Sequence, residues 1–314
     1  MREPMARRCL SERGENAQRP VSDILSIMAV TVASALLAGP VRAGSEANFV
    51  LYDFHTGDKG ETEVNVFSDF SSGTKADAHY NAQLFEIEHA LTDRLTTALY
   101  LEGDDIDGEN YQFGGWRLEG RYRLLDYGAF LNPVLYVEYE NLQPARSYVL
   151  DVVGRTDAAD GPKSAERDIE SKLILGGDVT NDLSVDFNWI NETNLDTGRW
   201  DFGYAFGLNY ALDSSVDQEA EPPGKHWAGK GTLHSNNVSD LTVKEVKLGA
   251  ELYGGLGDSM QGLTFDPDRT QQYAGLNLLV ETNGGAHVKV GAAVGLTGES
   301  ERGLMRLMVG YEFQ

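Results

Sequence analysis

Residues 112–124 read QFGGWRLEGRYRL, and the alternation within this stretch decides the fold. One set of alternate positions carries Trp116, Leu118, Gly120, Tyr122 and Leu124, and the other carries Arg117, Glu119, Arg121 and Arg123. Successive side chains of a β-strand point to opposite faces. The stretch therefore predicts a strand with one apolar and one charged face.

The same period of two recurs along the chain and predicts twelve strands in all. They are Glu61–Phe67, Tyr80–Leu91, Leu95–Glu102, Gln112–Leu124, Pro133–Leu142, Asp168–Gly176, Leu183–Ile190, Trp200–Leu212, Val243–Tyr253, Gln272–Glu281, His287–Leu296 and Leu304–Phe313. A soluble β-sandwich would also alternate, but several of these segments exceed the usual five or six residues and are long enough to cross a bilayer at a tilt. We predict an all-β fold, a closed antiparallel transmembrane β-barrel of about twelve strands.

The connections between these segments alternate in length. Thr92–Arg94, Thr180–Asp182 and Asn283–Gly285 are short and rich in turn formers, whereas Gly103–Tyr111, Gln143–Arg167 and Gly254–Thr270 are long and acidic or glycine-rich. Short turns at one rim and long loops at the other are typical of outer-membrane barrels. Residues 213–242 break the rule, because a long segment falls at the short-turn rim. This segment is either an irregular insertion or contains a further hairpin.

The N-terminus has the composition of an export signal. Basic residues precede the apolar stretch ILSIMAVTVASALL, residues 24–37, and Gly39-Pro40 and the small residue Ala43 follow it. The apolar core is shorter than the roughly 20 residues of a membrane-spanning helix, which favours a cleaved signal over an anchor. We predict a signal peptide over residues 1–43 and one barrel domain over residues 44–314. The single cysteine, Cys9, lies in the segment predicted to be removed.

The charge balance excludes one class of partner. The 314 residues include 26 Lys and Arg against 49 Asp and Glu, a net charge of −23. Binding to nucleic acid requires a basic face, so no nucleic-acid partner is expected.

The chain resembles Gram-negative outer-membrane β-barrels of the porin-like class. The last segment, RLMVGYEFQ, places Leu307, Val309, Tyr311 and Phe313 at every second position, as the last strand of that family does, although Gln314 follows the aromatic residue. Residues 84–102, LFEIEHALTDRLTTALYLE, also resemble the strand–turn–strand units of these proteins. The resemblance implies a location in the bacterial outer membrane, contact with membrane lipids and lipopolysaccharide, and recognition of these four residues by the barrel-assembly machinery.

Aromatic residues near the strand ends fit an interfacial girdle. They are Tyr80, Phe113, Trp189, Trp200, Phe202, Tyr253, Tyr273, Tyr311 and Phe313.

The polar faces of the strands predict the lining of the lumen. The residues expected to point inward are Glu86, Glu88, Arg117, Glu119, Arg121, Arg123, Glu138, Glu140, Glu170, Lys172, Asp186, Glu245, Lys247, Glu251, Lys289, Arg306 and Glu312. They form either a wet, charged passage or a lumen filled by mutual ion pairs, in which Arg121 and Arg123 pair with Glu138 and Glu140 on the next strand. Twelve strands enclose more space than the eight that side chains just fill, which favours a passage.

Enzymatic and metal-binding patterns are weak. His234 and Ser235 evoke an outer-membrane lipid hydrolase, but adjacent residues of a strand point to opposite faces. Residues 103–109, GDDIDGE, lack the carboxylates that an EF-hand needs, although they could bridge lipopolysaccharide phosphates through divalent ions. The six histidines show no metal-ligand spacing. We therefore expect no cofactor and no enzyme, but a porin-like channel for small solutes, with a lipid-modifying hydrolase or a structural or adhesive barrel as alternatives.

Overall fold

The computed structural model describes residues 47–72, 80–106, 111–127, 129, 131–143, 166–214, 241–260 and 262–313. All of them fall within one compact unit, Pro40–Gln314. In these ranges no helix combines the length and apolar character needed to span a membrane. The predicted signal peptide lies outside the described residues and stays a prediction.

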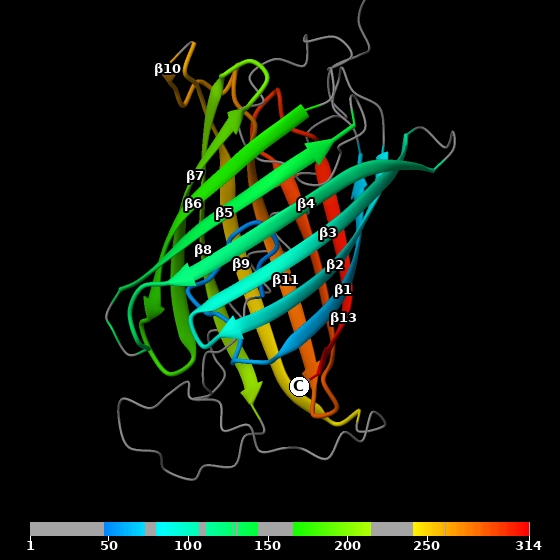
Figure 1. Cartoon of the computed structure of the whole chain (residues 1–314), viewed down its shortest axis with the longest axis vertical. Helices are drawn as coiled ribbons and strands as arrows, with labels where there is room; N and C mark the ends of the chain where they lie inside the picture. The colour runs from blue at the N-terminus through cyan, green and yellow to red at the C-terminus, as the bar shows by residue number, and fades with distance from the viewer. Residues whose placement is uncertain are drawn as a thin grey trace, which may run out of the picture. The chain divides into compact units, whose positions relative to one another are not determined.

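Thirteen strands form one antiparallel sheet (Figure 1). Their bounds are β1 Thr62–Ser71, β2 Tyr80–Thr92, β3 Leu95–Ile106, β4 Gln112–Arg123, β5 Asn132–Leu142, β6 Glu166–Asp178, β7 Leu183–Asn194, β8 Trp200–Ser214, β9 Val243–Asp258, β10 Gly262–Leu263, β11 Gln272–Thr282, β12 Ala286–Gly295 and β13 Gly303–Phe313. Twelve of them make the wall, and the two-residue β10 pairs only with the end of β9.

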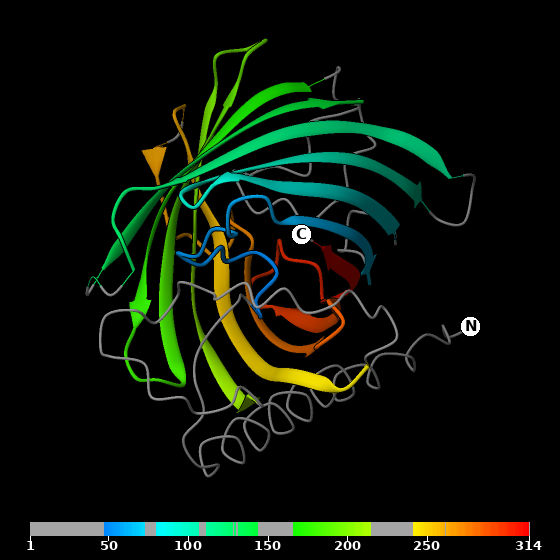
Figure 2. The ribbon, with the colours of Figure 1, turned by 60° about the horizontal axis from the view of Figure 1, so that its bottom comes forward.

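The sheet closes on itself. β13 pairs with β1 from Phe313↔Thr62 to Leu304↔Ser71, and β8 pairs with β9, so every wall strand has two neighbours (Figure 2). Each of the twelve predicted segments corresponds to one wall strand. The prediction of a closed antiparallel barrel of about twelve strands is confirmed. Closure removes the free edges that would otherwise leave backbone groups unpaired in a membrane.

Several strands extend past their predicted ends, and the four longest extensions lie at the long-loop rim. β1 continues to Ser71, β3 to Ile106, β7 to Asn194 and β9 to Asp258. The predicted loop from Gly103 is therefore wrong at its start. The ladder hydrogen bonds of a sheet require only backbone groups, so pairing continues where the side chains turn acidic or small and the apolar alternation ends.

The long connection between β8 and β9 joins two strands that are neighbours in the sheet. These strands pair directly up to Ser214↔Glu245, so no strand lies between them in the wall. Residues 215–240 lie outside the described residues, and the role of the 213–242 segment stays a prediction. By contrast, the β11–β12 turn is as tight as expected: Gly285 adopts φ 88°, which favours glycine, and its N–H donates to Thr282 O at 3.1 Å.

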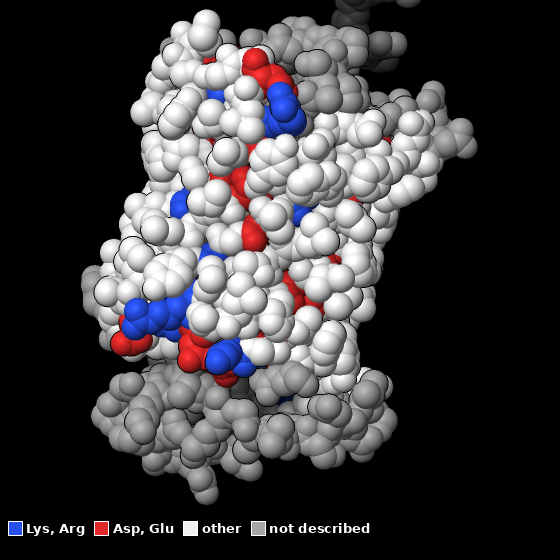
Figure 3. Space-filling model, in the orientation of Figure 1, with Lys and Arg blue, Asp and Glu red and all other residues white. Residues whose placement is uncertain are grey.

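The outer face of the wall is apolar. Val137, Leu118 and Val309 are 54%, 53% and 51% exposed, and large hydrophobic residues of most other strands are exposed beside them. In Figure 3 white atoms predominate on the visible face, and the largest groups of charged atoms lie toward its two ends. An exposed apolar surface of this extent is what a lipid-facing barrel presents.

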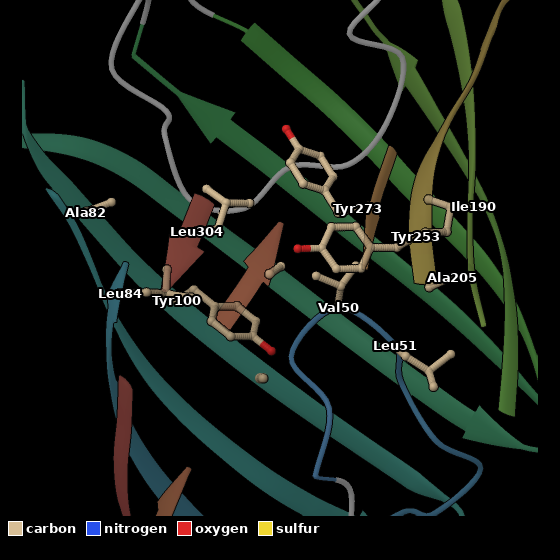
Figure 4. Close-up of a cluster of buried hydrophobic side chains, with 12 residues drawn as sticks. Val50, Leu51, Ala82, Leu84, Tyr100, Ile190, Ala205, Tyr253, Tyr273 and Leu304 are labelled. Atoms are coloured by element: carbon tan, nitrogen blue, oxygen red, sulfur yellow. The ribbon is translucent and has the colours of Figure 1, made fainter. Parts of the chain in front are cut away.

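The interior is more apolar than the alternation predicted. Besides charged residues, the inner face carries a buried cluster that includes Leu84, Tyr100, Ile190, Tyr253 and Tyr273 (Figure 4). Tyr253 and Tyr273 were expected in the girdle, and that prediction is wrong. They share the parity of the inward residues of β9 and β11, and their rings stack with centroids 5.2 Å apart.

Candidate functional site

The charged residues expected in the lumen all lie on the inner side of the wall. Most are less than a tenth exposed: Glu86, Glu119, Arg121, Arg123, Glu138, Glu140, Glu170, Asp186, Glu245, Lys247, Glu251, Lys289 and Arg306. Glu88, Arg117, Lys172 and Glu312 are partly buried. Since the neighbouring residues on each strand face outward, these charged side chains line the interior of the barrel.

Arg117 on β4 lies among three buried carboxylates of the lumen. Its Nε donates to Glu102 on β3 at 3.0 Å, and its Nη1 lies 3.4 Å from Glu138 and 3.1 Å from Glu140 on β5. One guanidinium therefore serves three carboxylates on two neighbouring strands. Glu102, which the sequence analysis did not select, is 3% exposed.

The predicted pairing of Arg121 and Arg123 with Glu138 and Glu140 is wrong. The β4–β5 register sets Arg121 opposite Tyr136 and Arg123 opposite Val134, while Glu140 faces Arg117. Arg121 instead pairs with Glu88 across β3 and with Glu119 on its own strand, the latter at 2.7 Å.

Arg123 makes no ion pair with either predicted partner and instead binds near the short-turn rim. It donates to the main-chain oxygens of Leu125 and Asp93, both at 2.6 Å, and to Thr56 Oγ1 at 3.2 Å. Arg123 therefore holds the turns of that rim and the segment that precedes β1.

A segment that is not part of the wall lies inside the barrel. We call residues 47–56, ANFVLYDFHT, the plug segment; it is drawn in blue within the ring of strands in Figure 2. Ala47 and Leu51 are fully buried, and Phe54 is 2% exposed. A passage lined by charged side chains was favoured from the sequence, yet in this structure a stretch of the chain itself occupies the interior.

Wall side chains bind the main chain of the plug segment. The carboxylate of Glu251 on β9 accepts the N–H groups of Phe49, Val50 and Leu51 at 3.3, 3.0 and 3.1 Å. Asn188 on β7 makes a two-way contact with Tyr52, because its Oδ1 accepts the Tyr52 N–H and its Nδ2 donates to the Tyr52 O, both at 2.7 Å.

Three further strands bind the beginning of the plug segment. Asn209 on β8 accepts the Ala47 N–H at 2.9 Å, Lys289 on β12 donates to Asn48 O at 2.8 Å, and Arg306 on β13 donates to Phe49 O at 3.4 Å. Main-chain groups buried without partners are costly, so these contacts are what allows an irregular segment to sit in the interior.

Tyr52 is the side-chain anchor of the plug segment. Its hydroxyl donates to Glu119 Oε2 at 3.3 Å, and its ring lies 4.3 Å from Lys172 Nζ and 5.4 Å from the Arg121 guanidinium carbon. Its ring centroid is 5.0 Å from that of Tyr136. Cations over an aromatic face are attractive, so the charged lumen holds this ring as well as the main chain.

Little space separates the plug segment from the wall on one side. A cavity of about 10 Å³ lies between Phe49 and the wall residues Glu251, Asn277 and Arg306. Such a volume is about that of one water probe. At this point the packing between the plug segment and the wall leaves room for about one water molecule.

One group of carboxylates has metal-ligand spacing among the described residues. Oxygens of Glu138, Glu140 and Glu170 lie within 4.8 Å of one another. Arg117 lies at 3.4 and 3.1 Å from Glu138 and Glu140, and Lys172 lies 2.7 Å from Glu170. Two protein cations already pair with these three carboxylates, so we assign no metal to the group.

The weaker candidate motifs contribute little. His234 and Ser235 lie outside the described residues. Residues 103–106 are part of β3, with Asp104 fully buried, and residues 107–109 of the proposed ion-bridging loop lie outside the described part of the chain.

The proposed assembly signal faces outward on β13. Leu307, Val309 and Phe313 are 36%, 51% and 43% exposed, and the rings of Tyr311 and Phe313 stack with centroids 6.2 Å apart. Phe113 and Trp200, two of the expected girdle residues, are 54% and 49% exposed. Recognition by an assembly machinery stays a prediction.

Neither the plug segment nor the amide residues that bind it were predicted from the sequence. Asn188 alternates with the apolar residues of its strand, but only charged residues were selected for the lumen. The signal for the plug segment was present: residues 47–56 are rich in aromatic and aliphatic side chains, unlike a polar linker between a leader and a first strand.

Comparisons with known proteins find similar folds among solved structures but no matching sequence family. No protein-family model and no curated protein sequence matches the chain. Among solved structures it is similar to the KdgM porin (13% identity, TM-score 0.46, covering 80% of this chain and 99% of that one). It is also similar to an outer-membrane channel from Pseudomonas putida F1 (14%, 0.48, 85% and 100%). A third similar structure is the translocator domain of the autotransporter NalP from Neisseria meningitidis (12%, 0.43, 94% and 96%).

Proposed function

We propose that this protein is a porin-like channel of the bacterial outer membrane whose lumen is closed by its own plug segment. The observation that carries the proposal is the composition of the two faces of the wall. An apolar outer face surrounds an interior to which every wall strand contributes at least one charged or amide side chain, beside inward apolar residues. Apolar-out and polar-in alternation is the pattern of barrels that enclose an aqueous pathway.

The outer face and the strand lengths support insertion in a membrane. All wall strands have at least ten residues, against the 9–11 that a tilted membrane-spanning strand needs. Membrane lipids would contact Leu118, Val137 and Val309, and lipopolysaccharide would contact the long-loop rim. The outward residues Tyr311 and Phe313 would be read by the barrel-assembly machinery during insertion.

The plug segment supports a gated channel. It contributes no ladder hydrogen bond to the wall strands, so its departure would leave the twelve-strand ladder intact. Hydrogen bonds between Gly60 N and Ala90 O at 2.8 Å and between Glu61 N and Asp58 O at 2.9 Å fix the turn that joins it to β1. This turn is a natural hinge about which the plug segment could leave the lumen and return.

The test compares conductance with the plug segment seated and unseated. Leu51→Asp places a carboxylate beside Glu251, whose oxygen the Leu51 N–H binds at 3.1 Å, so like-charge repulsion and burial both oppose the seated state. We expect refolded wild type in planar bilayers to be closed or to open rarely, and Leu51→Asp to conduct steadily. Val137→Asp, which changes an outward residue by the same chemistry, should not raise conductance.

The ion pairs that fill the lumen favour one other function, a structural barrel that does not conduct. The same recordings decide between them. A Leu51→Asp barrel that inserts, resists detergent unfolding and passes no current would contradict the channel and favour the structural barrel. A lipid-modifying hydrolase has no support from the described residues.

A further inference from the structure

We propose that the inner wall contains a binding track for a peptide main chain, which the plug segment occupies when no solute is bound. Short peptides, or solutes that present the same spacing of amide groups, would then be the substrate class of the channel. The inference rests on the proposed function for its physiological meaning, but the binding itself can be measured without conductance.

The wall recognises main-chain atoms of the plug segment. Five wall side chains, on β7, β8, β9, β12 and β13, bind N–H or C=O groups of the six consecutive residues from Ala47 to Tyr52. These groups are common to every peptide sequence except at proline. Recognition through main-chain groups gives affinity that does not depend on sequence.

Two contacts recognise main-chain geometry, an extended residue at Tyr52 and a bend at residues 49–51. Asn188 satisfies both the N–H and the C=O of Tyr52 at 2.7 Å, which requires an amide that offers donor and acceptor on one side. Glu251 gathers three consecutive N–H groups on one carboxylate, at 3.0 to 3.3 Å. Hydrogen bonds to a charged acceptor are stronger than neutral ones, so Glu251 is the main determinant of affinity.

Glycines on the inner face of the wall make room for the plug segment. Inward-facing glycines stand opposite three plug residues: a Cβ on Gly207 would lie 2.8 Å from Leu51 Cδ2, one on Gly291 2.5 Å from Phe49 Cε2, and one on Gly249 still closer to Asn48 Oδ1. A side chain at any of these positions would collide with the occupant. Glycine in a strand interior weakens the strand and commonly marks a close approach of another backbone or a ligand.

These glycines, on β8, β9 and β12, alternate with the hydrogen-bonding residues around the lumen. Together the glycines and the hydrogen-bonding residues line the part of the wall against which the plug segment lies. Sequence preference would arise from the few contacts to plug side chains, such as Asn277 Nδ2 to Asn48 Oδ1 at 3.2 Å and the Tyr52 hydroxyl to Glu119. The plug segment thus resembles a tethered ligand that a free peptide must displace.

The experiment measures binding of labelled peptides to the full-length Leu51→Asp protein in detergent, in which the wall is unchanged and we expect the plug segment to be unseated. The first probe is the peptide ANFVLYDFHT. The second is the same peptide with N-methyl groups on the residues that match Val50 and Leu51, which removes two donors to Glu251 and keeps every side chain. The third is a ten-residue peptide of unrelated, proline-free sequence.

We expect the first peptide to bind at least tenfold more tightly than its N-methylated form, and the unrelated peptide to bind within about tenfold of the first. Glu251→Ala in the Leu51→Asp background removes the acceptor and should abolish most of the difference between the first two probes. The matched change Glu245→Ala, on the same strand but without a described contact to the plug segment, should preserve that difference.

Three results would overturn the inference. Equal binding of the first two peptides would show that the main-chain donors are not recognised. Binding of the native peptide but not of the unrelated one would show a site for the plug segment alone, not for a substrate class. Absence of binding by all three would show that no track exists. Conductance of the same variant reports separately on the channel, so either proposal can fail while the other stands.

Discussion

Glu251 offers the sharpest single perturbation of the closed state. Its carboxylate accepts three main-chain N–H groups of the plug segment and the side-chain amide of Asn277 at 2.9 Å. Glu251→Ala leaves three N–H groups of the seated plug without that acceptor, at a cost of about 1 kcal/mol or more each. The seated state should lose about 3 kcal/mol relative to the unseated one, which is roughly a hundredfold change in their ratio.

The assay is the open fraction in single-channel recordings, because it reports this ratio directly. Glu251→Gln keeps one amide oxygen as an acceptor and removes the charge, so its open fraction should lie between those of wild type and Glu251→Ala. Glu245→Ala removes a carboxylate from the same strand and should leave the open fraction near that of wild type. Equal open fractions in wild type and Glu251→Ala, with both barrels folded, would refute the reasoning.

Three other predictions test separate parts of the molecule. Burial, and then the charge of Glu312, raises the pKa of Glu61 at the hinge to about 7, so the folded state binds a proton more tightly than the unfolded chain. The temperature at which half of the protein loses the gel mobility of the folded barrel should therefore fall as the pH rises from 5 to 8. Glu61→Gln should make this temperature less dependent on pH, and an unchanged pH dependence would contradict the assignment. Arg117→Ala removes the guanidinium shared by three buried carboxylates and should lower the same temperature clearly, whereas the exposed Arg94→Ala should hardly change it. Phe313→Ala should reduce the amount of protein in the outer membrane on immunoblots if the last strand carries the assembly signal, and undiminished amounts would remove that role.

The architecture was predictable because a barrel wall repeats one simple rule. Each strand alternates apolar and polar residues, as residues 116–124 do, and the period alone assigns a face to every side chain. Strand ends were less predictable, since β3 and β9 continue through acidic and glycine-rich residues where alternation ends.

Partners within the lumen could not be predicted from the same rule. Alternation states that Arg121 points inward, but the β4–β5 register decides that Arg117, not Arg121, faces Glu140. Alternation also gives no sign that the inward Gly249 lies against the plug segment, where a Cβ would meet Asn48. The plug segment itself is recognised by side chains from strands more than a hundred residues away, and local sequence carries no information on such contacts.

The central claim is that the plug segment closes the lumen and must move for solutes to pass, and a disulfide tests it most directly. A Cβ on Gly249 would lie 3.1 Å from Asn48 Cγ, close to the separation that a disulfide imposes between one Cβ and the opposite sulfur. The only native cysteine, Cys9, lies in the predicted signal peptide, so Asn48→Cys with Gly249→Cys gives a single defined pair. The measurement is bilayer conductance of this variant before and after reduction, in the Leu51→Asp background that favours the unseated state. The account predicts a closed barrel when oxidised and an open one when reduced; equal conductance in both states, with the disulfide confirmed by mass, would contradict it.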